Sequence, residues 1–331
     1  MPELPEVEFT ARQLRASVLN ATIRDVQIFW ERTIGTPAAP AFRSLLTGQR
    51  ILQVRRRGKY LLFDLGRASD PELLMTVHRR MTGNLYLLPP GWEIDTRAQT
   101  TNPVAWNTRG PDFLYSTSPT TSSQQNVPVL VHEEASVYYD PTELSHCRVC
   151  FDLADGSRLL FTDARKFGRI ELWPADREEE ALTGLGPEPL GADFTADILA
   201  RHLSRRKGPI KAVLLAQETV AGLGNIYADE ALFLASIHPL RPANSLSTDE
   251  LTHLHEAIVS VLTMGIEHGG TTFSGYRGLR GELGENYDHL RAYHKAGESK
   301  YCTRCGGQIA TLVIAQRTAH FCPTCQRLSA E

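Results

Sequence analysis

The 331-residue sequence lacks long apolar runs and lacks an excess of basic charge. No stretch approaches the roughly 18 consecutive apolar residues of a membrane-spanning helix, and the acidic start has no signal-peptide pattern. Lysine and arginine total 35 against 38 aspartate and glutamate, which gives a net charge of −3. Bulk charge therefore does not indicate a nucleic-acid-binding protein. We expect a cytoplasmic protein with no membrane partner. Its positive charge should be confined to limited patches of the surface.

Cysteine is also scarce, and its six occurrences all fall in C-x2-C pairs. Two of the pairs close the chain: Cys302, Cys305, Cys322 and Cys325. Four thiolates complete a tetrahedral Zn²⁺ site with no position open for catalysis. Two disulfides are the alternative, which a reducing compartment disfavours. We expect one structural zinc ion, held at a short β-hairpin.

The third pair, Cys147 and Cys150, stands apart from the others. On a strand, positions i and i+3 face opposite sides, which is poor geometry for chelation. We interpret both as structural cysteines, with a redox or second metal site as the alternative.

The chain begins Met1-Pro-Glu-Leu-Pro-Glu-Val-Glu8. Removal of Met1 would leave Pro2 as a secondary amine, with Glu3 and Glu6 nearby. An α-amino group titrates near about 7.7–8.0 and a lysine near about 10.4, so the former is the better neutral-pH nucleophile. Attack on a sugar aldehyde carbon gives an iminium that withdraws electrons from the neighbouring C–H bond. The alternative is an ordinary helix N-terminus.

The N-terminal half combines one helix with many short strands. Apolar residues recur at helical spacing over residues 5–18. Short β-prone runs punctuated by glycine predict an antiparallel sandwich or barrel. The runs are 51–54, 60–63, 73–77, 85–88, 147–153, 158–162 and 170–173. Residues 91–141 are polar and aperiodic, which is typical of a surface insertion, and disorder is one interpretation of it.

From residue 178 the composition becomes helical, so we place a domain boundary at 174–188. Pro209 begins a helix that we expect to stop at Ala221–Gly224, and Asn225 is predicted to cap the next one. The capping box Ser247–Glu250 begins a third helix, and 271–300 reads as a long loop. Backbone N–H groups after the glycine turn would suit a phosphodiester. The alternative there is a tight helical hairpin.

Basic side chains gather in two places that could face one cleft between domains. One cluster is Arg50, Arg55, Arg56, Arg57 and Lys59, and the other is Arg201, Arg205, Arg206, Lys207 and Lys211.

Five motifs occur in the order typical of formamidopyrimidine-DNA glycosylases, which are base-excision DNA glycosylase/AP lyases. They are Met1–Glu8, Arg56–Leu62, Thr162–Gly168, Val220–Glu230 and the four-cysteine finger. The sequence resembles a bacterial member of that family over nearly the whole chain apart from 91–141.

The resemblance implies an α+β multidomain fold. An N-terminal antiparallel β-sandwich flanked by helices would be the catalytic domain, with a helical helix-two-turn-helix domain for DNA binding and a C-terminal zinc-finger β-hairpin. We assign 1–173 to the first, 178–270 to the second and 301–331 to the finger. Residues 271–300 would form the lesion-capping loop and linker.

The resemblance also implies residue roles. Pro2 would be the nucleophile that forms a Schiff base, Glu3 the general acid/base, and Glu6 a residue that positions the terminus. The predicted phosphate contacts are Lys59, His78, Asn225 and Arg317. The predicted wedge that fills the gap left by the flipped nucleotide is Met81, Arg165 and Phe167. The chain departs from the family pattern at Arg79 and Arg80, which we expect to add phosphate contacts or alter opposite-base preference.

The resulting hypothesis is a bifunctional enzyme acting on damaged double-stranded DNA. It would excise 8-oxoguanine or formamidopyrimidines and then cleave the strand by β,δ-elimination. We expect a monomer that associates with the nucleoid through DNA. Two alternatives stay open: an endonuclease VIII-like enzyme for oxidised pyrimidines, and a non-catalytic DNA-damage binder.

Overall fold

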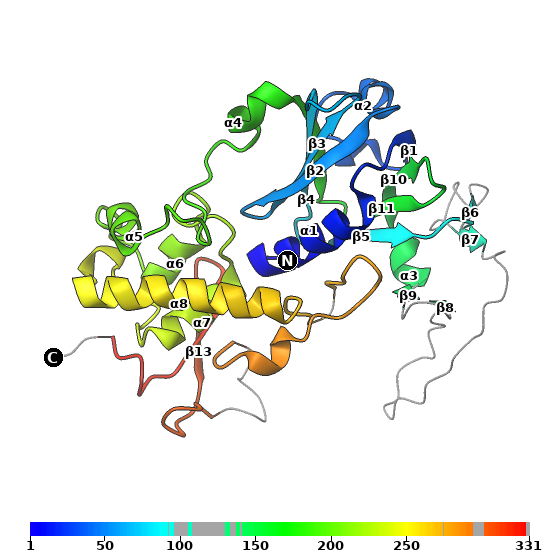
Figure 1. The fold of residues 1–331 in the computed structure, drawn as a ribbon. Coiled ribbons are helices and arrows are strands. Elements are labelled where there is room, and N and C mark those ends of the chain that lie inside the picture. The colour runs from blue at the N-terminus through cyan, green and yellow to red at the C-terminus, as the bar shows by residue number, and fades with distance from the viewer. Residues whose placement is uncertain are drawn as a thin grey trace.

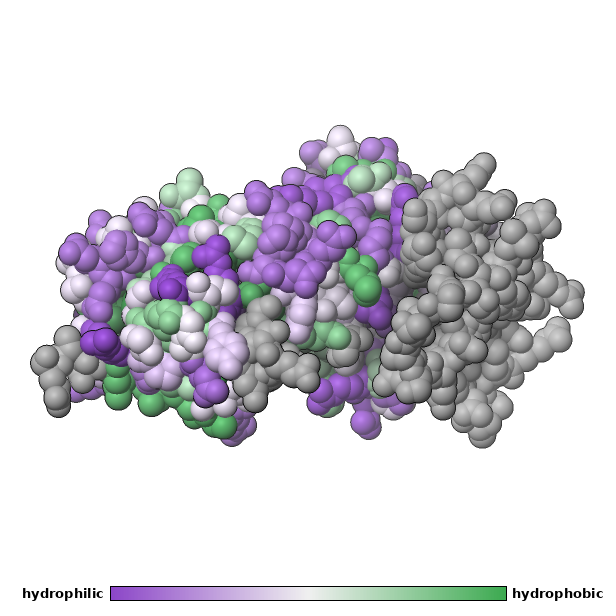
Figure 2. All heavy atoms as spheres, turned by 90° about the horizontal axis from the view of Figure 1, so that it is seen from below, coloured by the Kyte–Doolittle hydropathy of each residue, from purple (hydrophilic) through white to green (hydrophobic). Residues whose placement is uncertain are grey.

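The computed structural model describes residues 1–91, 93–95, 105–107, 130–132, 137–139, 141–273, 275–293 and 301–328. Most of the predicted insertion at 91–141 lies outside these residues. Within it, β6 (Glu93–Asp95) pairs with β7 (Ala105–Asn107), and β8 (Leu130–His132) pairs with β9 (Val137–Tyr139). None of the described helices is long and apolar enough to cross a membrane. On the face shown in Figure 2, hydrophilic residues predominate in the middle, and apolar residues form smaller patches between them.

The N-terminal half is a sandwich of two four-stranded antiparallel sheets. One has the order β1-β10-β11-β5 and the other β12-β4-β3-β2. The strands are β1 (Ile23–Ile28), β2 (Arg50–Arg57), β3 (Tyr60–Gly66), β4 (Leu73–His78), β5 (Gly83–Leu88), β10 (Cys147–Leu153), β11 (Arg158–Asp163) and β12 (Arg169–Pro174). Apolar side chains alternate inward from both sheets to make one core, as the two-residue period of a strand requires.

Three helices flank the sandwich: α1 (Leu4–Val18), α2 (Ala39–Leu46) and the short α3 (Pro141–Leu144). The apolar stripe of α1 joins the sandwich core, which is why a helix with a polar opposite face forms here. Figure 1 shows α1, in blue, between strand β2 and the long yellow helix α8 (Thr248–Glu267). The N-terminus of the chain therefore lies between the two halves of the molecule.

The two cysteines of β10 correct one expectation. Cys147 and Cys150 do not face opposite sides of the sheet, because the pairing register shifts between Cys147 and Val149. Both side chains lie in one cluster on the outer face of the sheet, whereas Val149 points into the sandwich core. Burial raises the pKa of the Cys147 thiol to about 12, so the interpretation as structural cysteines holds.

The second half is helical. Its helices are α4 (Glu178–Ala181), α5 (Ala196–Leu203), α6 (Ile210–Leu215), α7 (Asn225–Leu234) and α8. The capping box at the start of α8 is confirmed: Glu250 N donates to Ser247 Oγ, and Ser247 N donates to Glu250 Oε2. The helix ends before Gly269 and Gly270, whose φ values of 70° and 84° favour glycine. Helix α5 was not predicted from the sequence.

Two helix ends differ from expectation. Helix α6 stops at Leu215 rather than at Ala221–Gly224, because the side chain of Gln217 bonds to the backbone on both sides of the turn. Gln217 Nε2 donates to Leu215 O at 3.1 Å, and Oε1 accepts from Gly222 N at 3.0 Å. Asn225 does not cap α7. It is the first residue of that helix, and Gly224 is the N-cap.

The C-terminal finger is the hairpin of β13 (Ala310–Ile314) and β14 (Arg317–Phe321), drawn in red beside α7 in Figure 1. Ala315 and Gln316 form its turn with φ values of 48° and 60°. Two successive residues in the left-handed region of backbone conformation form a tight hairpin turn, and the twist of such a turn matches the twist of the strands.

Candidate active site

The first residues of the chain form the centre of the site. Pro2 is buried, and Glu3 is the N-cap of α1. Glu3 N donates to Glu6 Oε2 at 2.7 Å. Glu6 Oε1 accepts from Thr271 N at 2.7 Å and from the Tyr227 hydroxyl at 2.8 Å. Glu6 therefore fixes the start of α1 against α7 and against the segment that follows α8.

The carboxylate of Glu3 occupies the N-terminus of α7. Its Oε1 accepts from Ile226 N at 3.0 Å and its Oε2 accepts from Tyr227 N at 3.4 Å. The approach requires Gly224, because a Cβ there would lie 2.3 Å from Glu3 Cδ. The prediction that these N–H groups receive a phosphodiester is therefore wrong, because a carboxyl group of the protein already accepts from them.

Burial raises the pKa of Glu3, while the charge of Lys59 and the N–H of Ile226 act in the opposite direction. Glu3 is 3% exposed. Burial therefore favours the protonated form of this carboxyl group. The group lies next to Pro2, at the end of the chain.

A buried lysine faces the same carboxylates. Lys59 is 5% exposed and lies in the turn between β2 and β3. Burial lowers its pKa, whereas Glu3 and Glu6 raise it. Within the described part of the chain, its ammonium has no hydrogen bond or ion pair. A buried cation without a partner is a favourable site for an external anion such as a phosphate.

The terminal amine lies in this environment as well. Burial lowers the pKa of the Met1 amine, against the attraction of Glu3 and Glu6. Lys59 acts in the same direction as burial. Removal of Met1 would place the amine on Pro2, one residue closer to these groups.

Three of the four arginines of the first basic cluster are ion-paired. They bind acidic residues, two of which lie on the linker between the two halves. The pairs are Arg55 with Asp64 and Glu178, Arg56 with Glu8 and Glu188, and Arg57 with Glu188. These arginines hold the linker against β2, so they are unavailable to phosphates.

Two turns at one edge of the sandwich carry the predicted wedge residues. Met81 lies in the β4–β5 turn and is half-buried. Arg165 and Phe167 lie in the β11–β12 turn, and the Arg165 guanidinium is 5.0 Å from the centroid of the Phe167 ring. Phe167 is 52% exposed, so it is not a core residue. An aromatic ring held at the surface is suited to stacking on a base.

Asp163 connects these two turns by hydrogen bonds. The sequence analysis did not identify it as a site residue. Its Oδ1 accepts from the Thr82 hydroxyl of the β4–β5 turn and from Arg165 N at 3.2 Å. Its Oδ2 accepts from Gly168 N at 2.6 Å. Asp163 is 1% exposed. A buried carboxylate that accepts from both turns fixes their relative positions; its only local signal is its place at the end of a β-prone run.

His78 lies at the end of β4, between the wedge and Lys59. Its ring packs edge-on against Tyr60 at 4.6 Å between centroids, and its Nδ1 accepts from Arg80 N at 3.0 Å. Burial, with Arg80 and Lys59 adding to it, lowers the pKa of His78 to about 3. The imidazole is therefore neutral, and Nε2 carries the proton that can be donated to a phosphate.

The expectation that Arg79 contacts a phosphate is wrong. Arg79 is 1% exposed, and its guanidinium points into the protein. Arg80 is exposed and has a φ of 53°.

The four finger cysteines converge on one point. Their sulfur atoms all lie within 4.8 Å of one another, and Cys302 Sγ is 3.8 Å from Cys325 Sγ. Four thiolates bound at about 2.3 Å in a tetrahedron would lie about 3.8 Å apart. The residues fit one structural zinc ion, which leaves no coordination position for substrate.

The finger places Arg317 beside the start of α7. Asn225 Nδ2 donates to Thr318 O at 3.1 Å, next to the exposed Arg317. Lys211 Nζ donates to the same carbonyl at 2.8 Å. Asn225 Oδ1 is buried without a hydrogen bond among the described residues. Two predicted phosphate contacts from distant parts of the sequence thus become neighbours.

Family models match this chain in three parts. The formamidopyrimidine-DNA glycosylase N-terminal domain matches residues 1–170, the formamidopyrimidine-DNA glycosylase H2TH domain matches 185–276, and a zinc finger found in FPG and IleRS matches 299–328. The chain belongs to the formamidopyrimidine-DNA glycosylase family. The predicted family, enzyme class, fold class and single structural zinc are confirmed.

Relatives of this family cover almost the whole chain. The formamidopyrimidine-DNA glycosylase of Chloroflexus aurantiacus is 37% identical, over 98% of this chain and 98% of its own length. That of Symbiobacterium thermophilum is 40% identical over 98% and 89%. A Lactococcus lactis FPG mutant complexed with Fapy-dG-containing DNA has a TM-score of 0.76 at 30% identity, covering 98% of this chain and 100% of that one.

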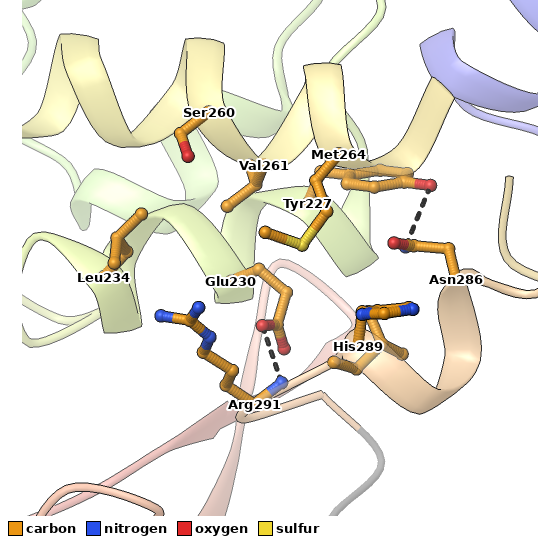
Figure 3. Close-up of a pocket in the computed structure, with 10 residues that line it drawn as sticks. Tyr227, Glu230, Leu234, Ser260, Val261, Met264, Asn286, His289 and Arg291 are labelled. Carbon is orange, nitrogen blue, oxygen red and sulfur yellow. Dashed lines mark hydrogen bonds between the residues drawn. The ribbon is translucent and has the colours of Figure 1, made fainter. Parts of the chain in front are cut away.

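This family member also has a cavity of about 160 Å³ behind the active site, between α7, α8 and residues 286–291. Figure 3 shows Tyr227 and Asn286 on one side of it, with the Asn286 amide 3.5 Å from the Tyr227 hydroxyl. Glu230 accepts from Arg291 N at 2.8 Å on the other side. Tyr227 therefore separates the cavity from Glu6. Sequence reasoning did not single out Tyr227 or Asn286, because nothing local distinguishes them from core residues.

Proposed function

We propose that the protein removes oxidised purines from duplex DNA and then cleaves the strand as an AP lyase, with Pro2 as the nucleophile. The observation that carries the proposal is the buried Glu3 carboxyl group, fixed by α7 immediately beside Pro2 and close enough to Lys59 to shift its pKa. A proton donor, an amine and a phosphate-binding cation are thereby brought to one place.

The chemistry follows from these three groups. The Pro2 nitrogen, freed by removal of Met1, attacks C1′ of the damaged nucleotide, and the bond from C1′ to the base breaks. Glu3 supplies the proton that opens the sugar ring, and burial, which raises the pKa of this group, favours its protonated form. The iminium acidifies C2′–H, so loss of that proton expels the 3′ phosphate, and a second elimination expels the 5′ phosphate.

Phosphate contacts and the wedge would hold the DNA in place for this reaction. Lys59 and neutral His78 approach from the sandwich, and Asn225 and Arg317 approach from the helical half and the finger. Met81, Arg165 and Phe167 would fill the emptied stack, because unstacking a base costs about a few kcal/mol. We infer that a monomer suffices, since every proposed group comes from one chain.

Solved relatives support damaged DNA as the partner. Lactococcus lactis FPG has been crystallised with Fapy-dG-containing DNA and with DNA containing an abasic site. One observation favours a second candidate substrate: the wild-type Lactococcus lactis protein has also been crystallised with DNA containing an oxidised pyrimidine, at 30% identity to this chain.

Borohydride trapping on an 8-oxoguanine duplex tests the nucleophile. We expect a covalent complex through Pro2 and mass spectrometry that shows Met1 absent from active enzyme. Retention of Met1 on active enzyme would contradict the mechanism, and a correctly processed Pro2→Gly variant that traps as fast as wild type would contradict a special role for proline. Excision assays on 8-oxoguanine and thymine glycol duplexes separate the two substrate classes.

A further inference from the structure

Arg79 is a buried cation in an unusual position. It lies in the β4–β5 turn, two residues before Met81, and is 1% exposed. Burial lowers its pKa. Its neighbour Arg80 is exposed, so the two arginines of this turn have different surroundings.

Among the described residues, the hydrogen-bond acceptors of the Arg79 guanidinium are all neutral oxygens. Its Nε donates to Gly83 O at 2.7 Å and its Nη1 donates to Thr10 Oγ1 at 2.9 Å. Its Nη2 donates to Asn84 Oδ1 and, at 3.5 Å, to Arg277 O. No carboxylate of the described residues pairs with it. Burying a cation in this way is costly, and an unbranched apolar side chain of similar length would avoid the cost.

The partners of Arg79 belong to three separate elements. Gly83 and Asn84 begin β5, Thr10 lies on α1, and Arg277 follows α8 by ten residues. The guanidinium cation also lies 5.2 Å from the centroid of the Tyr276 ring, which adds a cation–π contact. Arg79 thus connects the turn that carries Met81 with a segment from the other half of the molecule.

Residues 275–282, which we call the capping segment, dock along β5. Asn84 Nδ2 donates to Gly275 O at 2.6 Å, and Leu87 N donates to Leu279 O at 3.0 Å. Gln13 of α1 accepts from Leu279 N at 2.8 Å. In Figure 1 this segment, in orange, extends from the end of α8 past α1 toward β5. Asn84 therefore holds both the segment and Arg79.

We propose that Arg79 is a positioning residue that clamps the capping segment to the β4–β5 turn, so that Met81 and the segment are placed together. The inference rests on the proposed function: Met81 enters the emptied stack while the segment encloses the displaced base. One planar guanidinium donates both to the start of β5 and to the capping segment. Displacement of either the β4–β5 turn or the segment therefore breaks hydrogen bonds of Arg79.

An Arg79→Met variant tests the clamp by separating two reactions. Base excision from an 8-oxoguanine duplex needs the base to be enclosed, whereas strand cleavage at a preformed abasic site has no base to enclose. We expect single-turnover excision to fall about 10- to 100-fold, since small misplacements cost up to about 100-fold. Abasic-site cleavage should stay within about threefold. Arg79→Lys should recover part of excision, because an ammonium keeps the charge but not the planar fork.

Two further variants extend the test. Asn84→Leu breaks the clamp from the other side, so it should reproduce the same split, and its effect should not add to that of Arg79→Met. Thr10→Val removes an Arg79 partner on α1 that also bonds to Tyr276 of the capping segment, so it should show a weaker form of the same split. Trypsin cleavage after the exposed Arg280 should be faster in Arg79→Met, which reports release of the segment.

Equal losses in both reactions, or an unchanged ratio, would overturn the clamp while leaving the proposed function intact. Additive effects of Arg79→Met and Asn84→Leu would overturn it as well. Wild-type protein inactive on both substrates would instead refute the proposed function, and the trypsin rates would then still decide whether Arg79 holds the segment.

Discussion

Two clusters of buried charge contact helix α7, and only one is complete within the chain. The finger anchor is Lys211, Asp229 and His320. Lys211 Nζ lies 2.7 Å from Asp229 Oδ1 with both side chains 0% exposed, and His320 N donates to Asp229 Oδ2 at 2.9 Å. The N-terminal cluster is Glu3, Glu6 and Lys59. Its carboxyl groups are held by backbone N–H groups and the Tyr227 hydroxyl, and its lysine has no hydrogen-bond or ion-pair partner among the described residues.

The two clusters differ in whether the buried lysine has an acidic partner, and this difference indicates what each lysine does. Burial lowers the pKa of both Lys59 and Lys211. The protein supplies an anion to Lys211, which therefore holds the zinc finger on α7. Among the described residues it supplies none to Lys59 within hydrogen-bonding distance, which leaves that ammonium open to an external anion. Changes in the finger anchor should affect stability, and changes in the N-terminal cluster should affect rate and DNA binding.

The largest effect should come from Glu3→Gln, which tests whether the N-terminal cluster is catalytic. Loss of a positioned acid should lower the single-turnover rate of excision by about 10²- to 10⁴-fold. The glutamine carbonyl oxygen can still accept from Ile226 N, so thermal unfolding should stay close to that of wild type. A rate within threefold of wild type would show that Glu3 has only a structural role.

Lys211→Met should have the next largest effect, on stability. It leaves the Asp229 carboxylate buried without its partner, which typically costs about 3–5 kcal/mol. Urea denaturation should show the loss in the free energy of unfolding. The double variant Lys211→Met/Asp229→Leu is the matched control and should recover part of it; a double variant as unstable as the single one would mean that the ion pair is not the cause.

Lys59→Met and Arg317→Ala should each weaken DNA binding by about 1.5–3 kcal/mol, the range for hydrogen bonds to charged groups. Each should also reduce the slope of log affinity against log salt by about 0.9, because one phosphate contact is lost. Affinity titrations over a salt series measure both quantities. Arg57→Met, which removes an arginine paired with Glu188, should leave the slope unchanged.

The smallest effect concerns pH. The pKa of Glu3 is raised in the folded protein above its ordinary value of 4.5, so the folded state binds this proton more tightly than the unfolded state. The stability of wild type relative to Glu3→Gln should therefore be greatest below about pH 4.5 and fall as pH rises through the folded-state pKa. The slope cannot exceed about 1.4 kcal/mol per pH unit. A difference independent of pH would show that folding leaves the pKa of Glu3 unchanged.

Local patterns predicted much of the fold and part of the site. Two C-x2-C pairs predicted the zinc ligands because four thiolates at that spacing have few other uses. The short β-prone runs predicted the strands, and the capping box predicted the start of α8. The errors arose where a distant residue decided the outcome. A register shift in β10 placed Cys147 and Cys150 on one face, and the Gln217 side chain ended α6 early.

The sequence by itself determined the elements, the metal ligands and the family, because those depend on residue type at short spacing. Tertiary structure decided which charges stay free. Arg55, Arg56 and Arg57 meet acidic residues that are mostly far away in sequence, whereas Lys59, two positions later, meets no partner within hydrogen-bonding distance in the part of the chain that the structure describes. It also placed Glu3, rather than a phosphate, at the N-terminus of α7. Pairing and burial depend on contacts between distant segments, so composition and periodicity could not reveal them.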